Sequence, residues 1–504
     1  MRRRALLSSL AATTTAALAG CASSTGEDAT TTRPTDDDGT TDAGTTTDDE
    51  VPSGEPAGYA SVVDLETGPR TYAFAPTGMH TDDGAHVSLW FDRTGTADHP
   101  PRLRGWLENA NDYANTFEVE WIPVVGRTHT RQPRCFDHGA RLHAAPTANN
   151  DLAETVPEVV RDESGFWRVV DVGPWMPARR RLDPGERVRL EYVLVGEPEM
   201  DGRPTGTYEF RGRDETARVA VWNADEPGPT RESRFSGRSV PAPSEDASVQ
   251  WFHDAAADTA VYLAPSRERV ELDGAVQFEV VNHGREAAQC GHWNVHKLVA
   301  GEWFHVAPRA HLSDCRVLHP GARMDWTLRA FNGEAVPCGS GCGGAGCRGG
   351  LTQGFLGGGE YAVVAGYGHP EDESAALVEL VGDPVEVVPT EDASVEVDGS
   401  TATVTTPRWG DGEHPPDATL VVSRAESADE RLLPEQVMAA SAGGFAGGGG
   451  ALRNALAAFE DGVERVEVRA DEYAVDGAVG HDADVGRFEL RGRAYEAARF
   501  GGDA

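Results

Sequence analysis

The sequence predicts a mainly β protein in which two antiparallel β-sandwiches are followed by a small α+β domain. Three observations lead to this prediction: short segments that alternate apolar and polar residues, frequent Gly, Pro and Asn between them, and an internal repeat. The chain has 504 residues, more than a single core accommodates. We expect one module at 58–245, a second at 246–390 and a third domain at 391–504.

The first 21 residues are typical of a signal for export and anchoring. Three arginines at 2–4 precede an apolar run at 6–19, which is shorter than the roughly 20 apolar residues of a membrane-spanning helix. Consecutive arginines before such a run fit a twin-arginine leader. The Leu-Ala-Gly-Cys sequence at 18–21 is similar to the lipobox of prokaryotic lipoproteins, in which the cysteine becomes the amino terminus and carries a lipid.

This resemblance implies a signal peptide at 1–21, a lipid on Cys21 and a location on the outer face of the cell membrane. An ordinary signal peptide with an incidental cysteine is the alternative. Residues 22–57 are rich in Thr and Asp and contain one large apolar residue, Val51. Such a segment cannot bury enough apolar surface to offset the ordering of its backbone, so we expect a disordered tether.

The charge of the chain excludes one class of partner. The sequence has 82 acidic and 45 basic residues, a formal net charge of -37, and a single lysine, Lys297. This balance argues against nucleic acid as a partner, and against membrane contact other than through the lipid. The composition resembles that of extreme halophiles, since molar salt screens such self-repulsion. An acidic mesophilic surface protein is the alternative.

An internal repeat relates the two expected modules. Residues 165–187 match residues 301–323 without a gap, at an offset of 136 residues. The recurring positions include a Gly-x-Trp and a Leu-x-Pro-Gly motif. Segments with period-two alternation surround the repeat at 187–195, 277–281, 293–299 and 323–329. Because Pro presets one backbone angle and Gly permits the other, Leu-x-Pro-Gly predicts a turn that enters a strand.

Each copy then has a Gly-x-Tyr motif, with Tyr208 in the first and Tyr361 in the second. These residues resemble the tyrosine corner of immunoglobulin-like domains, whose phenol ties a strand to nearby backbone. A strand ending in Asn, then Gly-x-Trp, Leu-x-Pro-Gly and Gly-x-Tyr together resemble the immunoglobulin-like modules of prokaryotic surface lipoproteins, over about 58–390. With the leader and composition, the chain is similar to haloarchaeal surface lipoproteins exported by the twin-arginine route. The resemblance implies adhesion, binding or spacing and no fixed chemistry.

The third domain is predicted to be α+β. Val395, Val397 and Val404 suggest a hairpin across Asp398-Gly399. Further strands are expected at 418–422, 463–468 and 487–490. A helix is expected where Leu452, Ala455, Leu456 and Phe459 recur at helical spacing.

Six cysteines besides Cys21 are candidates for disulfides, because an even number outside the cell favours bridges. They are Cys135, Cys290, Cys315, Cys338, Cys342 and Cys347. Cys290 and Cys315 are the first expected pair, since both fall in loops that can share one end of a sandwich. The last three lie in a Cys- and Gly-rich insertion at 331–359 that the first module lacks.

A metal is the alternative for that insertion. Thiolates of Cys338, Cys342 and Cys347 with His292 and His296, or with His305 or His311, would form a soft site for zinc or copper. Two histidines four apart on a strand point to the same face, so they either ligate one ion or line the solvated side. We expect the solvated side, and no cofactor.

The function predicted from these patterns is that of a non-catalytic lipoprotein whose modules bind or space a surface protein or glycan. Motifs of serine hydrolases, zinc proteases and nucleotide-binding loops do not occur in the sequence. The alternative is a metal-handling or redox lipoprotein that uses the second module, and an enzyme of unrecognised type is a third possibility.

Overall fold

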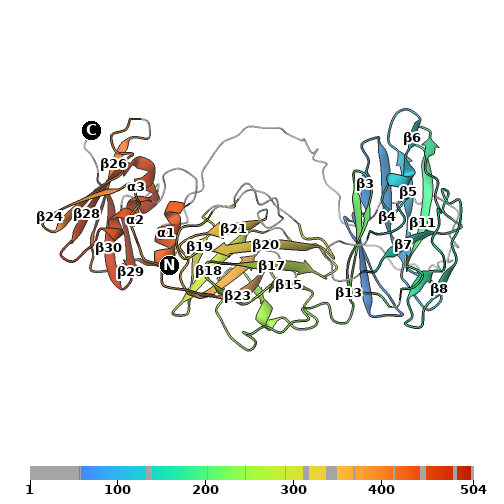
Figure 1. The fold of residues 1–504 in the computed structure, drawn as a ribbon, viewed down its shortest axis with the longest axis horizontal. Coiled ribbons are helices and arrows are strands. Elements are labelled where there is room, and N and C mark those ends of the chain that lie inside the picture. The colour runs from blue at the N-terminus through green and yellow to red at the C-terminus, as the bar shows by residue number, and fades with distance from the viewer. Residues whose placement is uncertain are drawn as a thin grey trace, which may run out of the picture.

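The protein was analysed as a computed structural model, which describes residues 56, 58–131, 139–200, 202–244, 246–289, 291–309, 311, 317–336, 349–366, 371–412, 415–442, 450–480 and 485–500. Figure 1 shows three domains in a row. Module 1 contains strands β1 to β13, module 2 contains β14 to β23, and the C-terminal domain contains β24 to β30 with three helices. The fold class predicted from the sequence is therefore confirmed.

Module 1 is a sandwich of two main sheets. One has the order β1-β2-β13-β12, the other has the order β3-β4-β5-β11-β9-β8 with β7 also paired to β11, and β6 pairs with β10. Tyr72, Phe74, Tyr208 and Phe210 from the first sheet pack against Tyr192 and its neighbours from the second. The strands of module 1 are β1 (Ser61–Asp64), β2 (Arg70–Ala75), β3 (Gly78–His80), β4 (Ala85–Arg93), β5 (Arg102–Asn109), β6 (Asn115–Phe117), β7 (Leu142–Pro146), β8 (Val159–Arg161), β9 (Trp167–Val169), β10 (Arg180–Leu182), β11 (Arg187–Gly196), β12 (Gly206–Arg211) and β13 (Thr216–Asn223).

Module 2 repeats this plan with fewer strands. A sheet with the order β14-β23-β22-β18-β19, to which β16 is added beside β23, faces the sheet β15-β17-β20-β21. Phe278, Val295, Leu328 and Tyr361 are among the residues of the core between them. The strands are β14 (Val249–Trp251), β15 (Val261–Pro265), β16 (Arg269–Glu271), β17 (Gly274–Asn282), β18 (Trp293–Val299), β19 (Glu302–Ala307), β20 (Arg323–Ala330), β21 (Gly350–Gln353), β22 (Gly359–Ala365) and β23 (Glu373–Val381).

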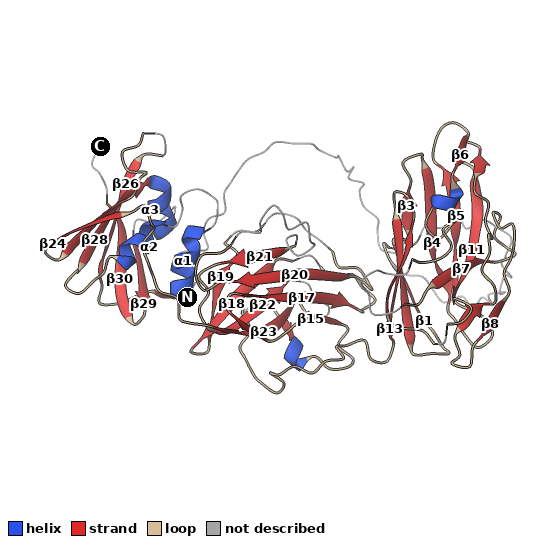
Figure 2. Cartoon of the chain, viewed as in Figure 1, coloured by secondary structure: helices blue, strands red, loops and turns tan. Residues whose placement is uncertain are grey.

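The C-terminal domain is a single sheet covered by helices. The sheet order is β24-β25-β28-β26-β30-β29-β27. Helices α2 and α3 pack against this sheet, and α1 contacts both α2 and strand β19 of module 2 (Figure 2). The elements are β24 (Ser394–Asp398), β25 (Thr401–Thr405), β26 (Asp417–Arg424), β27 (Glu430–Leu432), α1 (Pro434–Ala442), α2 (Gly450–Ala457), β28 (Arg465–Asp471), α3 (Glu472–Val479), β29 (Val485–Leu490) and β30 (Arg493–Phe500).

The period-two segments of the sequence all form strands, and the segment 293–299 coincides with β18. The hairpin expected at Asp398-Gly399 joins β24 to β25, and the helical spacing of Leu452, Ala455 and Leu456 belongs to α2. Phe459, which was also expected in this helix, lies beyond its end at Ala457. The sandwich sheets are not purely antiparallel, because β9 pairs in parallel with β11, β14 and β16 with β23, and β21 with β20. No helix within the described ranges is both long and apolar enough to cross a lipid bilayer.

A buried asparagine organises one end of each sandwich, and we call this arrangement the asparagine frame. In module 1, Asn109 Nδ2 donates to the carbonyl oxygens of Tyr113 (2.9 Å), Leu182 (3.2 Å) and Asp183 (3.1 Å). The Gly185 N–H donates back to the Asn109 carbonyl (2.9 Å). Side chain and backbone of one residue thus fix the Leu-x-Pro-Gly turn against the end of β5.

Module 2 contains the same frame. Asn282 Nδ2 donates to the carbonyl oxygens of Glu286 and Leu318, both at 2.8 Å, and the Gly321 N–H donates to the Asn282 carbonyl (2.7 Å). Both asparagines are fully buried. The turn glycines have φ angles of 68° (Gly185) and 74° (Gly321), which residues with a Cβ rarely adopt. The repeat in the sequence is therefore a repeat of structure.

The predicted tyrosine ties are confirmed in both modules. Tyr208 Oη donates to the Pro204 carbonyl and Tyr361 Oη to the Gly357 carbonyl, each at 2.8 Å and four residues upstream. Both tyrosine rings are buried. Each phenol thus satisfies a carbonyl that leads into β12 or β22.

Replacing Tyr361 with Phe is expected to lower the free energy of unfolding of module 2 by about 1–3 kcal/mol, because the Gly357 carbonyl loses its donor inside the protein. Chemical denaturation in molar salt measures the change. Tyr473→Phe is the control, since this side chain is 58% exposed. Equal midpoints for the two variants would show that the tie contributes nothing.

Candidate functional site

The predicted site residues His292 and His296 lie on the outer face of module 2, where two more histidines join them. The rings of His292 and His311 stack with centroids 4.3 Å apart, and those of His296 and His305 meet edge to face at 5.2 Å. His296 opposes His305 in the register of β18 and β19. We call these four residues, with Asn294 between them, the histidine surface.

Asn294 joins the two histidine pairs. Its Oδ1 lies 3.2 Å from His305 Nε2 and 3.0 Å from His311 Nε2. Burial, together with the neighbouring His305, lowers the pKa of His296 to about 3, and burial also lowers the pKa of His311. These two imidazoles are therefore neutral at physiological pH.

The geometry of the histidine surface does not form a metal centre by itself. A metal ion requires nitrogen lone pairs that converge on one point, whereas the stacked rings of His292 and His311 direct theirs along nearly parallel planes. No three His, Cys, Asp or Glu side chains in the described ranges are arranged to hold an ion. The predicted zinc or copper site also needs Cys338, Cys342 and Cys347, which lie outside those ranges.

The other cysteines, Cys21, Cys135, Cys290 and Cys315, also lie outside the described residues. The chain on either side of the expected Cys290–Cys315 pair is nevertheless joined. Ala288 and Leu318 exchange two backbone hydrogen bonds, at 2.9 and 3.2 Å. This antiparallel bridge brings together the segment that precedes Cys290 and the segment that follows Cys315.

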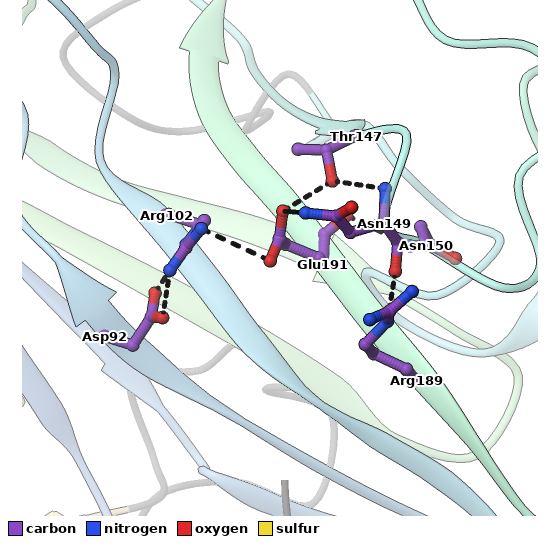
Figure 3. Close-up of polar contacts among 7 residues, drawn as sticks. All are labelled: Asp92, Arg102, Thr147, Asn149, Asn150, Arg189 and Glu191. Carbon is purple, nitrogen blue, oxygen red and sulfur yellow. Dashed lines mark hydrogen bonds and ion pairs between the residues drawn. The ribbon is translucent and has the colours of Figure 1, made fainter. Parts of the chain in front are cut away.

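A buried carboxylate lies at the centre of a polar network in module 1 (Figure 3). Glu191, only 2% exposed, accepts hydrogen bonds from Thr147 Oγ1 (2.7 Å) and Asn149 Nδ2 (3.1 Å) through Oε1. Its Oε2 lies 3.3 Å from Arg102, which also pairs with Asp92. Oε1 of this carboxylate thus fixes the 147–151 loop on β11, while Oε2 faces Arg102 of β5. Its role is structural.

A surface hollow of module 2 lies where the segment that enters the module crosses β22 and β23. Arg238 pairs with Glu360, and Arg234 pairs with Glu379 at 2.8 Å. Hydrogen bonds from Arg269 hold the pKa of Glu379 below its usual value. The charges in the hollow cancel in pairs, so it presents polar groups without a net charge.

Modules 1 and 2 are joined by aromatic stacking. Trp222, at the end of β13, stacks on His283 with centroids 5.1 Å apart, and Tyr59 stacks on His319 at 4.1 Å. The turn glycine Gly321 lies against β2 and β13, where an added Cβ would be 2.5 Å from that of Ala220. The end of module 2 that carries the asparagine frame therefore rests on the outer face of module 1.

The only lysine of the chain joins module 2 to the C-terminal domain. Lys297 of β18 forms an ion pair with Glu435 of α1, and the two side chains are 11% and 4% exposed. The Lys297 ammonium also lies 5.3 Å from the ring centroid of Tyr361. Gln436 Nε2 donates to the His305 carbonyl (3.1 Å), and Arg431 lies over Phe304. The sequence identified Lys297 as unique, but no pattern in it pointed to Glu435.

Comparison with known proteins gives no family. No family model and no curated protein matches the chain. Two solved structures with weak similarity are a polysaccharide lyase (9% identity, TM-score 0.13, 65% of this chain and 37% of that chain) and E. coli alpha-2-macroglobulin in its native conformation (8% identity, TM-score 0.15, 71% and 20%). The chain thus spans well under half of either protein. Scores this low carry no argument about function.

Peptide mapping without reduction is expected to find Cys290 linked to Cys315, and Cys135, Cys338, Cys342 and Cys347 in two further bridges. Closure of this loop would stabilise module 2 by about 3 kcal/mol. In the control, Cys290→Ser, Cys315 becomes alkylatable. Free thiols at Cys338, Cys342 and Cys347 would instead favour the metal or redox alternative.

Proposed function

We propose that the protein is a non-catalytic lipoprotein anchored to the outer face of the cell membrane. Its two β-sandwich modules bind a surface protein or glycan, or hold it at a distance from the membrane. The observation that supports this most directly is the buried Lys297–Glu435 pair. A protein that holds a partner at a defined distance needs stiff joints between its domains. Removing one member of a buried ion pair leaves an uncompensated charge, so bending at this joint is costly.

The second joint supports the same proposal. Trp222 is only 4% exposed, and its ring stacks on His283 with an interplanar angle of 6°. The two modules therefore meet over the whole face of a ring at this position, and not at a single pair of atoms. The modules therefore have two independent contacts at this joint, since Tyr59 and His319 form another. A spacer built in this way keeps its domains in one order and orientation.

The leader supports the proposed location. In this proposal the lipid on Cys21 provides the membrane attachment, and the net charge of -37 keeps the folded domains away from anionic headgroups and excludes nucleic acid as a partner. The competing proposal, a metal-handling or redox lipoprotein, depends on the histidine surface together with the cysteines at 338–347.

The Cys21→Ala variant is expected to move the protein from the membrane fraction to the soluble fraction, because the lipid attachment point is lost. Mass spectrometry of the wild-type N-terminal peptide should find a lipid-modified cysteine. Ser23→Ala is the control and remains with the membrane. A soluble wild-type protein with an unprocessed N-terminus would contradict the anchor.

The Lys297→Met variant is expected to loosen the C-terminal domain, since Glu435 is then buried without a counter-charge. The cost is about 3–5 kcal/mol, and replacing Glu435 with Gln in addition recovers part of it. Small-angle X-ray scattering should show a broader distribution of interdomain distances. Arg487→Met, which removes an exposed pair with Glu496, should leave the scattering unchanged.

A further inference from the structure

Module 1 contains a buried cation that forms no ion pair with a carboxylate of the described residues. The Arg203 side chain precedes β12 and is 3% exposed. Its guanidinium donates to the Trp167 carbonyl (2.9 Å) and contacts the Met200 sulfur (3.3 Å), and it lies 5.6 Å from the ring centroid of Phe166. Among the described residues no acidic side chain forms an ion pair with it, and its Nε has no hydrogen-bond partner.

The two nearby acids, Asp162 and Glu197, bond to backbone N–H groups and not to the Arg203 guanidinium. Asp162 accepts the Phe166 N–H (2.8 Å), and Glu197 accepts the Arg141 N–H (3.1 Å). A second guanidinium, that of Arg70, approaches the opposite side of the network: its Nε donates to the Arg203 carbonyl (2.7 Å), and it too lies near the Phe166 ring. The Arg203 guanidinium is therefore buried without a carboxylate in contact with it. Because arginine cannot release its proton in a protein, burial of this charge is costly unless an anion compensates it.

A small cavity adjoins Arg203. Apolar side chains of Leu65, Phe166 and Leu194 form part of its wall, and Tyr72 lines it beside Arg203. The free volume is about 10 Å³, which is room for one particle of about the size of a water molecule. The cavity thus combines a guanidinium whose Nε has no hydrogen-bond partner, a phenol and an apolar wall.

We infer that this cavity is an internal anion site and that its occupant is a single chloride ion. A water molecule would fill the space but leave the charge of Arg203 uncompensated. A carboxylate, sulfate or phosphate group is too large for it. Chloride is monatomic, accepts hydrogen bonds from N–H and O–H donors, and fits among apolar groups because it carries no donor that needs a partner. The ion would tie the segment before β12 to Phe166 and the start of β9.

Bromide replaces chloride and gives an anomalous X-ray signal, so crystals of the full chain in bromide test the site directly. We expect an anomalous peak within hydrogen-bond distance of Arg203 Nε. Density without an anomalous signal at this position would identify a water molecule and overturn the inference. This test needs no substitution, so it does not depend on whether a variant folds.

Chloride-dependent stability provides the second test. At constant ionic strength, replacing gluconate with chloride should raise the melting temperature of the wild type, by about 5–10 °C when chloride is 100-fold above its Kd. Arg203→Met should abolish this dependence and Tyr72→Phe should weaken it. Arg218→Met, at a side chain that is 60% exposed, is the matched control and keeps it. Equal chloride dependence in Arg203→Met and wild type would refute the site.

Discussion

The asparagine frame is the constraint on which both modules depend. A carbonyl group buried at a sandwich end has no water to bind, so it must find a donor within the protein. One carboxamide supplies that donor to Leu182 in module 1 and to Leu318 in module 2, while its own backbone accepts from the turn glycine. The Leu-x-Pro-Gly turn therefore cannot shift without leaving several buried polar groups without hydrogen bonds. The tyrosine tie then fixes the start of the following strand, β12 in module 1 and β22 in module 2.

In module 2, but not in module 1, the turn of the asparagine frame also forms part of a contact between domains. Gly321 needs its positive φ angle for the turn, and its missing Cβ also lets β2 and β13 of module 1 approach. At the equivalent Gly185, an added Cβ would meet open space, and that turn is exposed. The two modules thus share the same kind of turn, but only the turn of module 2 is part of an interdomain joint. His319, which replaces Asp183 of the first copy, adds a ring that stacks on Tyr59.

The sequence predicted those features that local chemistry determines. The alternation of apolar and polar residues predicted strand β18, and the Gly-x-Tyr motifs predicted the hydrogen bonds of Tyr208 and Tyr361. The Asp398-Gly399 pair predicted the hairpin between β24 and β25. Helix α3 was missed although Asp471 is a good N-cap and Ala474, Val475 and Ala478 recur at helical spacing, because the segment is only eight residues long. The pairing of Lys297 with Glu435 and the stacking of His283 and His319 on module 1 were beyond prediction, because contacts between distant segments depend on how domains meet and not on spacing along the chain.

The joints explain how an acidic chain keeps its shape. Asp64 and Arg285 form an ion pair between modules 1 and 2, but both are about half exposed, so salt weakens their attraction. Lys297 and Glu435 are shielded from solvent, and salt screens them far less. Trp222 and Tyr59 stack on His283 and His319, and burial lowers the pKa of both histidines, so these contacts join uncharged rings that salt does not screen. If the protein works in concentrated salt, its alignment must rest on these buried and aromatic contacts, while the screened surface acids no longer push the domains apart.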